Sequence, residues 1–277
     1  MLEFLPEEFS AVLKNFDLKN VDELRLRVGK PSFALINGKF LPVGVTVTQA
    51  ALRKTITALT EHSLYRYEEN LKNCYLVGSC GERVGICGER VVGGDVGSVK
   101  NVSSLCIRLP REVKNCAYKT CETVFKNAIK NLLVISAPGA GKTTFLRDTA
   151  RILSDNYYKN VLLIDEKGEL SGKSFDVGKR TDVMKFSGKS FGLKFGVTNM
   201  RPDVIVLDEL TEEVETKAII SAVYSGVNVV ASAHGASLEN VKKRSLFAGV
   251  FAEKIFDFAV VLSDMPKVGT VKEVVSL

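Results

Sequence analysis

Hydrophobic patterning changes along the chain at about residue 115. Beyond residue 118, short continuous apolar runs alternate with amphipathic segments, as in buried parallel strands joined by helices. We predict strands at 132–136, 161–165, 204–208, 228–232 and 257–262. Helices are expected near 119–129, 142–154, 213–225 and 238–247. This alternation predicts an α/β fold whose parallel sheet is covered on both faces.

The first part of the chain reads differently. A helix is expected at about 6–15, and PSFALINGKFLPV alternates like a hairpin with Asn37-Gly38 as its turn. Apolar residues at helical spacing run from 48 to 72, a glycine-rich stretch of short strand-like pieces covers 74–94, and 102–109 is a further strand. Pro110 and the basic PREVK stretch resemble a linker. We therefore predict a smaller α/β domain at 1–112 and a second domain at 118–277.

A phosphate-binding loop is indicated where the first predicted strand of the second domain meets a helix. Residues 132–148 read LLVISAPGAGKTTFLRD, and Ser136 stands where the motif usually has its first glycine. Glycines let the backbone curl with its N–H groups toward phosphate, and the helix dipole favours an anion there. Lys142 is expected to reach the β- and γ-phosphates, and the Thr143 hydroxyl to ligate Mg²⁺. The nucleotide-binding candidates are Pro138, Gly139, Ala140, Gly141, Lys142, Thr143 and Thr144.

A second acidic motif, VIVLDE, ends another apolar run at residues 204–209. A buried parallel strand ending in Asp-Glu delivers both carboxylates to the sheet edge where such folds bind ligands. Asp208 is expected to hold Mg²⁺, and Glu209 to orient or deprotonate the attacking water. The alternative is a strand followed by the acidic cap of the next helix, since Glu212, Glu213 and Glu215 follow. Together with the phosphate loop, the motif predicts a nucleoside-triphosphate site.

Two further strand ends contribute candidates. VLLIDEKGE at 161–169 places Asp165 and Glu166 at the same edge, near magnesium or the lytic water. The alternative for both is a solvated junction between strand and loop. His234 lies near the end of the segment VVASAHG (229–235), just beyond the predicted strand, where it is expected to contact the γ-phosphate and report hydrolysis. The alternative is a surface or capping histidine.

Arginines near the domain junction are also candidates. Arg108 and Arg111 suit an arginine supplied across a subunit interface to stabilise charge on the transferred phosphoryl group. Ordinary basicity of the linker explains them equally well.

Composition narrows the class of protein. The 277 residues are 45% hydrophobic and 25% charged, which is typical of a globular protein, and no apolar run approaches the roughly 20 residues that span a bilayer. MLEFLPEEFS lacks the features of a signal peptide, and none of the six cysteines forms a C-x-x-C pair. A net charge of +6 without a basic and aromatic track does not predict nucleic-acid binding. We expect a reduced, cytoplasmic protein without direct membrane insertion.

These motifs resemble, in order and spacing, those of the stage III sporulation AA family, within the secretion-ATPase superfamily of pilus-retraction and type II/IV secretion motors. The matching segments cover nearly the whole chain: ELRLRVGKP (23–31), GERVGICGERV (81–91), CIRLPREV (106–113), ISAPGAGKTTFLRD (135–148), VLLIDEKGEL (161–170), DVGKRTDV (176–183), MRPDVIVLDEL (200–210) and ASAHG (231–235).

The resemblance implies a RecA-like P-loop ATPase core behind a smaller α/β domain, using ATP and Mg²⁺. It also implies a homo-oligomeric, hexameric ring that energises membrane-embedded channel proteins between mother cell and forespore from the cytoplasmic side. By the same resemblance, Glu166 falls in the acidic box, Asp208-Glu209 in the Walker B position and His234 in the histidine box. Arg108 falls where such ATPases present an arginine to a neighbour's nucleotide.

Some residues depart from the pattern of the relatives. Thr211-Glu212 stands where a Gly-Arg pair often follows the Walker B residues, and Thr198 stands where an arginine is frequent. These departures keep open a nucleotide-gated scaffold with little hydrolysis. A P-loop small-molecule kinase is a further alternative, although we find no arginine-rich lid, and a DNA-pumping motor is weaker still. The absence of an N-K-x-D motif favours adenine over guanine.

Overall fold

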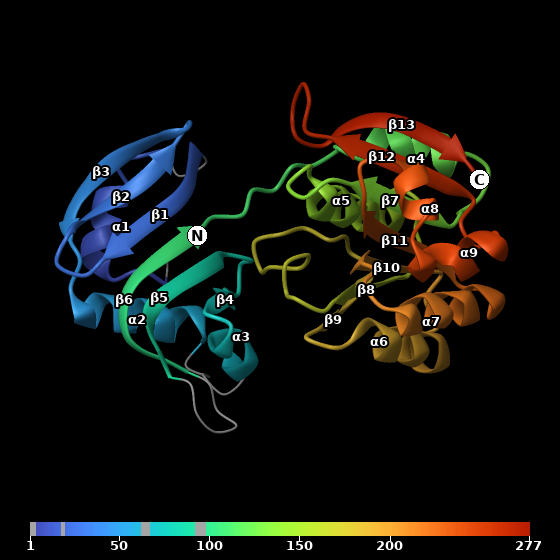
Figure 1. The fold of residues 1–277 in the computed structure, drawn as a ribbon. Coiled ribbons are helices and arrows are strands. Elements are labelled where there is room, and N and C mark those ends of the chain that lie inside the picture. Colours follow the sequence, from blue (N-terminus) through green and yellow to red (C-terminus); the bar gives the residue numbers. More distant parts are fainter. Residues whose placement is uncertain (1–3, 18–19, 62–66, 92–97) are drawn as a thin grey trace. The chain divides into compact units, whose positions relative to one another are not determined.

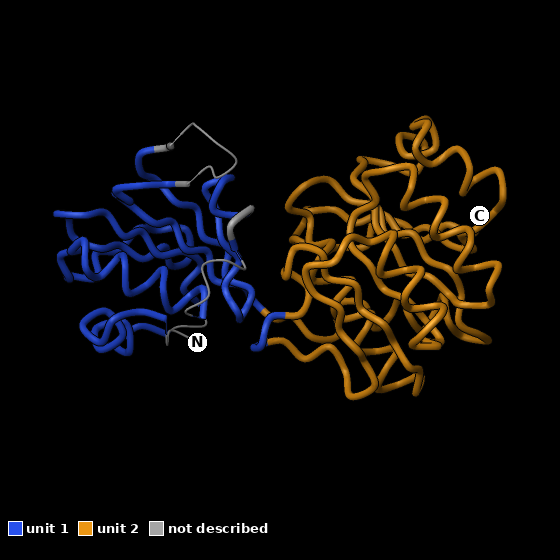
Figure 2. Tube along the Cα trace, turned by 90° about the horizontal axis from the view of Figure 1, so that it is seen from below, with its two compact units in different colours: residues 1–111, 172–174 blue, residues 112–171, 175–277 orange. Residues whose placement is uncertain are grey.

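The computed structural model describes residues 4–17, 20–61, 67–91 and 98–277. The chain divides into two compact units (Figure 2). Unit 1 comprises residues 1–111 and 172–174, and unit 2 comprises residues 112–171 and 175–277. Each unit has its own sheet and its own buried core.

Unit 1 contains an antiparallel sheet of order β3-β2-β1-β6-β5-β4 (Figure 1). Apolar side chains such as Phe9, Leu24, Leu52 and Ile107 are buried together in its core. Its strands are β1 (Val21–Arg27), β2 (Pro31–Ile36), β3 (Lys39–Thr46), β4 (Tyr75–Val77), β5 (Arg83–Val91) and β6 (Ser98–Arg108). Its helices are α1 (Glu7–Leu13), α2 (Gln49–Leu59) and α3 (Glu68–Lys72).

The predicted hairpin is present in unit 1. Strands β2 and β3 pair antiparallel, and φ is 50° at Asn37 and 78° at Gly38, the left-handed values that a two-residue turn of this type requires. The helical spacing over 48–72 corresponds to two helices, α2 and α3, because α2 ends at Leu59 and Glu61 is left-handed with φ 48°. Residues 62–66 of that prediction, and residues 92–94 of the glycine-rich stretch, lie outside the described residues.

Residues 172–174 also belong to unit 1, although the residues before and after them in the chain belong to unit 2. The backbone N–H of Lys173 donates to the carbonyl of Ser79 (2.8 Å), and the hydroxyl of Ser174 donates to the carbonyl of Cys80 (3.0 Å). A Cβ at Gly172 would lie 2.2 Å from the Cys80 carbonyl oxygen, so only glycine fits there. No sequence pattern had indicated this segment, because it depends on contacts with residues far away in the chain.

Unit 2 is built on a sheet of order β13-β12-β7-β11-β10-β8-β9 (Figure 1). Every neighbouring pair is parallel except β12 with β13. The five predicted strands are all present, as β7 (Leu132–Ser136), β8 (Val161–Asp165), β10 (Val204–Glu209), β11 (Asn228–His234) and β12 (Phe258–Ser263). The central strands are almost entirely buried, which is why they read as continuous apolar runs.

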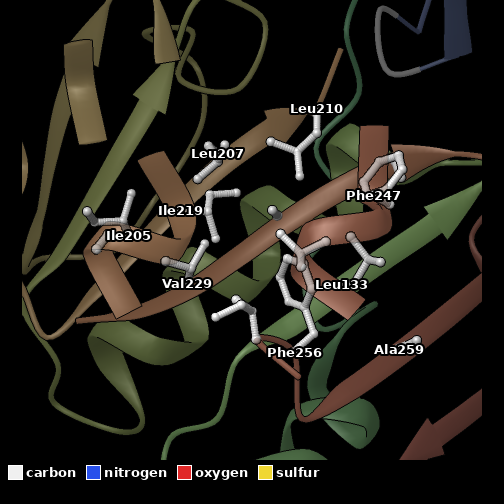
Figure 3. Close-up of a cluster of buried hydrophobic side chains, with 14 of the residues drawn as sticks. Leu133, Ile205, Leu207, Leu210, Ile219, Val229, Phe247, Phe256 and Ala259 are labelled. Atoms are coloured by element: carbon white, nitrogen blue, oxygen red, sulfur yellow. The ribbon is translucent and has the colours of Figure 1, made fainter. Parts of the chain in front are cut away.

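Helices cover both faces of this sheet, as predicted. Alternate residues of β7 point to opposite faces: Leu132 and Val134 pack with α4 (Tyr118–Val124) and α5 (Lys142–Asp155). Leu133 and Ile135 pack on the other side with α6 (Lys189–Phe195), α7 (Glu213–Tyr224), α8 (Leu238–Lys242) and α9 (Ala248–Ala252). Figure 3 shows this second core, where Ile219 of α7 lies among side chains of the strands.

Several elements of unit 2 were not predicted. They are the edge strands β9 (Thr181–Lys185) and β13 (Thr270–Ser276), helix α6 and the π-helix η3 (Gly196–Met200). The predicted helix at 238–247 is instead α8, a 3-10 turn (Ser245–Phe247) and α9.

The structure also bears on the state of the cysteines and on membrane-spanning helices. All six cysteines are free thiols, and burial raises the pKa of Cys116 and of Cys121 to about 12, so both stay protonated at neutral pH. Among the described residues, no helix is long and apolar enough to cross a membrane.

Candidate nucleotide-binding and catalytic site

The phosphate loop connects β7 to α5. Gly139 and Gly141 adopt the left-handed conformation, with φ 78° and 91°, and Gly141 is the N-cap of α5. A Cβ built on Gly139 would meet nothing within 4 Å, which leaves room for a ligand against the backbone. A Cβ on Gly141 would lie 3.0 Å from Gly269, whose N–H donates to the carbonyl of Ala140 (3.2 Å). The loop therefore has left-handed glycines of the kind that a phosphate-binding loop uses, and the β12–β13 turn packs against Ala140 and Gly141.

Ser136 takes the place of the usual first glycine without disturbing this turn. It is the last residue of β7 and fully buried, and its hydroxyl donates to the carbonyl of Ala137 (2.9 Å). Its own carbonyl accepts the N–H of Gly235 at 3.0 Å. The serine side chain is thus accommodated within the strand end.

Lys142 is the first residue of α5, and its side chain is only 8% exposed. Its Nζ lies 3.6 Å from Oε2 of Glu209 and 3.9 Å from Oδ1 of Asp208. The structure therefore brings together the lysine of the phosphate loop and both carboxylates of the second motif. Asp208 and Glu209 end β10, and the acidic cap of the next helix that the sequence suggested is also present, since Glu212 and Glu215 form the capping box of α7.

Glu209 and Asp208 each have a further partner on the neighbouring strand β11. The Nε2 atom of His234 lies 3.0 Å from Oε2 of Glu209, and the hydroxyl of Ser232 donates to Oδ1 of Asp208 at 3.1 Å. The carbonyl of His234 accepts a hydrogen bond from Arg244 (2.9 Å). Strands β7, β11 and β10 are neighbours in the sheet (Figure 1), so these side chains lie together at its carboxyl edge.

The two carboxylates at the end of β8 have different surroundings, because Asp165 is buried and Glu166 is partly exposed. Oδ1 of Asp165 accepts the N–H of Glu169 (2.9 Å). Its Oδ2 accepts the N–H of Leu170 (3.1 Å) and both the N–H (2.8 Å) and hydroxyl (2.7 Å) of Ser171. These four bonds occupy Asp165, which is 2% exposed, in holding the turn. Glu166 is more exposed and lines a pocket with Asp208 and Glu209.

Replacing Asp165 with alanine is expected to lower the free energy of unfolding by about 2–4 kcal/mol, because four donors in and around a buried turn lose their acceptor. Urea denaturation measures this change. The matched control is Asp182→Ala on the exposed edge strand β9, for which the expected change is within about 0.5 kcal/mol. Equal effects of the two substitutions would contradict the structural role of Asp165.

A nucleoside triphosphate with Mg²⁺ suits this set of donors. The first N–H groups of a helix have no partner within the helix, so those at the start of α5 can donate to phosphate beside Lys142. The Thr143 hydroxyl and the Asp208 carboxylate are oxygen ligands of the type that Mg²⁺ prefers. Thr143 and Thr144 are partly buried on the first turn of α5, and Pro138 is exposed in the loop.

Arg108 belongs to unit 1, as the last residue of β6. Its side chain is 67% exposed, and its Nε lies 3.5 Å from Oε2 of Glu23, which also pairs with Arg25. Arg111 pairs with Asp22 at 2.6 Å in the same unit. The role of Arg108 at a neighbouring subunit's nucleotide stays a prediction.

The residues that depart from the relatives' pattern have local roles. The N–H groups of Thr211 (2.7 Å) and Glu212 (3.1 Å) both donate to Oε2 of Glu215, and Glu212 is the N-cap of α7. The hydroxyl of Thr198 donates to the carbonyl of Lys194 within the turn that leaves α6 (2.9 Å). Thr211-Glu212 therefore starts a helix.

Sequence reasoning missed Lys189 beside the site and named Glu215 only as part of the acidic cap of the next helix. Lys189 is 5% exposed, and its Nζ lies 2.5 Å from Oε2 of Glu166 and 2.7 Å from Oε1 of Glu215. Burial alone lowers the pKa of Lys189, but hydrogen bonds to the two carboxylates outweigh it, so the pKa is raised and the lysine stays charged. Among the described residues, the buried lysines Lys142 and Lys189 each lie near two carboxylates.

Comparison with solved structures identifies the class of fold. The chain is similar to the Legionella pneumophila ATPase DotB, with a TM-score of 0.63 and 14% identity over 91% of this chain and 74% of that one. It is equally similar to the pilus retraction motor PilT with bound ADP, with a TM-score of 0.63 and 14% identity over 90% of this chain and 76% of that one. The fold is the RecA-like P-loop core of secretion ATPases, preceded by an antiparallel α/β unit.

The sequence defines the family more narrowly. The chain belongs to the family described as sporulation stage III, protein AA, whose model matches residues 3–276. It is 30% identical to stage III sporulation protein AA of Bacillus subtilis over 98% of this chain and 93% of that protein. The family resemblance predicted from the motifs is confirmed.

Proposed function

We propose that this chain is a Mg²⁺-dependent ATPase of the secretion type. The observation that carries the proposal is the convergence of Lys142, Asp208, Glu209 and His234 directly beside an open phosphate loop. The two carboxylates come from the end of β10, the histidine from the end of β11 and the lysine from the start of α5. A binding loop without a hydrolytic role does not need the Glu209–His234 pair.

We assign a task to each group of the proposed site. Loop N–H groups and Lys142 hold the phosphates, while the Thr143 hydroxyl and Asp208 would hold Mg²⁺. When bound, Mg²⁺ neutralises charge on the phosphate oxygens. Glu209 orients a water and accepts its proton as the water oxygen bonds to the γ-phosphorus. The bond from that phosphorus to the β–γ bridging oxygen breaks, leaving ADP and inorganic phosphate.

His234 and Glu166 extend the site on two sides of Glu209. His234 lies within hydrogen-bonding distance of Glu209. A change at the γ-phosphate that moves Glu209 would therefore also move His234 at the end of β11. Glu166 lines the same pocket as Glu209, where a second carboxylate is well placed to act on the lytic water. In this proposal His234 responds to the γ-phosphate through Glu209, and Glu166 acts on the water that attacks the γ-phosphate.

The wider proposal concerns assembly and place in the cell. We propose that residues 118–277 form the ATPase domain and residues 1–112 a smaller domain. The chains would form a ring, as a hexamer, in which Arg108 reaches a neighbouring subunit's nucleotide. Membership in a sporulation family supports a role at the cytoplasmic face of a membrane channel complex between mother cell and forespore.

Phosphate release tests this function. We expect purified full chain to release phosphate from ATP only with Mg²⁺, with turnover per chain rising as protein concentration rises, because shared sites are completed on assembly. EDTA is expected to abolish the signal. Release that stays at background and is equal in a Glu209→Gln variant would contradict hydrolysis by this chain and favour the nucleotide-gated scaffold.

A further inference from the structure

Lys189 occupies a position that local helix formation does not explain. It is the first residue of α6, where the helix dipole disfavours a positive charge, and it is 5% exposed, which is rare for lysine. Two carboxylates compensate for both costs. Glu166 lies at 2.5 Å and Glu215 at 2.7 Å from its Nζ.

The two partners connect different parts of the proposed site. Glu166 follows the last residue of β8 and lines the pocket that contains Asp208 and Glu209. Glu215 lies in α7, and its other carboxylate oxygen accepts the N–H groups of Thr211 and Glu212. Those two residues come directly after β10 and Leu210. Lys189 is therefore the central member of a chain of contacts from Glu166 to the segment that follows Glu209.

Electrostatics makes Lys189 necessary for this arrangement. Glu215 is 4% exposed, and without Lys189 it would be a buried carboxylate whose remaining bonds are to backbone N–H groups. Glu166 would lose the cation that fixes its direction and would be repelled by Asp208 and Glu209 along the pocket they share. Removing one partner from a buried ion pair leaves an uncompensated charge, which is strongly unfavourable.

We propose that Lys189 is a positioning residue that holds Glu166 and the segment after Glu209 in one arrangement. The inference rests on the proposed ATPase function for its effect on turnover. Its structural half does not depend on hydrolysis, because it concerns the bonds within this chain from Thr211 and Glu212 to Glu215.

The test compares three substitutions in the full chain. Lys189→Met removes the charge but keeps much of the side chain's bulk, and Lys189→Arg restores a cation with several donors. Lys194→Met is the matched control, because Lys194 is an exposed lysine of the same helix. Each variant is measured for turnover, for ATP affinity by calorimetry, and for amide hydrogen exchange in the peptide that spans residues 208–216.

For Lys189→Met we expect kcat to fall by about 10- to 100-fold, as for a misplaced catalytic group, with ATP affinity within about twofold of wild type. Exchange at the Thr211 and Glu212 amides is expected to accelerate by roughly tenfold, since their acceptor loses its anchor. Lys189→Arg is expected to recover part of the lost turnover, and Lys194→Met to behave as wild type.

Two results would overturn the proposal. Unchanged amide exchange in Lys189→Met would show that Lys189 does not hold the segment, whether or not the chain hydrolyses ATP. Faster exchange with unchanged kcat would show that the segment's order is irrelevant to the reaction. If wild-type chain shows no turnover, the ATPase proposal fails, and the exchange measurement alone decides whether Lys189 anchors this segment.

Discussion

Replacing Glu209 with glutamine is expected to lower ATP turnover by about 100- to 1,000-fold while leaving ATP affinity within a few fold of wild type. Glutamine has nearly the shape of glutamate but cannot accept the proton of the attacking water. The carboxylate is well placed for that task, 3.0 Å from His234 Nε2 and 3.6 Å from Lys142 Nζ. Phosphate release and calorimetric ATP binding, measured on the same preparation, separate the two effects.

The matched control for this prediction is Glu213→Gln. Glu213 is an exposed glutamate at the start of α7, so its substitution removes the same charge from the same region without touching the cluster. Full turnover in Glu209→Gln would remove Glu209 from the proposed reaction. A parallel loss of ATP affinity would instead indicate that Glu209 holds the phosphate loop through Lys142.

The sequence predicts the buried framework of unit 2 because burial on both faces leaves a simple pattern. Strand β7 runs over Leu132–Ser136 as expected, and β8 matches its predicted limits, since each is buried at every position. The phosphate loop follows from its own local geometry, in which glycines supply the left-handed backbone. Features that depend on neighbouring residues in the chain were thus within reach of sequence reasoning.

The elements that sequence reasoning missed are those whose residues are half exposed. Strand β9 has the burial pattern of an edge, with Asp182 and Val183 exposed, and β13 pairs with one neighbour only. Helix α6 is seven residues long and carries Gly192, whose added Cβ would lie 2.9 Å from Ile164. A glycine required for close helix packing looks like a helix breaker when only the sequence is known.

The same limit applies to the candidate site. Asp165 and Glu166 are adjacent in the sequence, which does not show which carboxylate accepts hydrogen bonds from the backbone. The donors to Asp165 lie on the following turn. Lys189 and Glu215 lie 23 and 49 residues beyond Glu166 in the chain, and only the packing of α6 and α7 brings the three together. Long-range ion pairs of this kind leave no periodic signal.

Replacing Lys142 with alanine is expected to weaken ATP binding by about 100-fold or more, which corresponds to roughly 2.7 kcal/mol or more of binding free energy. Lys142 is the buried cation that can follow the phosphates, and the loop N–H groups that remain carry only partial charges. The loss also leaves Asp208 and Glu209 facing an incoming polyanion without a cation between them. Calorimetric titration with ATP and Mg²⁺ measures the affinity.

Thermal unfolding with and without nucleotide distinguishes lost binding from lost folding. ATP with Mg²⁺ at about 100 times Kd stabilises the native state by roughly 2.7 kcal/mol, so the wild-type Tm is expected to rise by about 5–10 °C. The Lys142→Ala variant is expected to show almost no rise. The control Lys119→Ala, which removes an exposed lysine from α4, is expected to keep the full rise. Because nucleotide-dependent stabilisation requires a folded site, a normal Tm without ATP together with no rise on its addition assigns the loss to phosphate binding. A full rise in Lys142→Ala would show that the phosphates bind elsewhere.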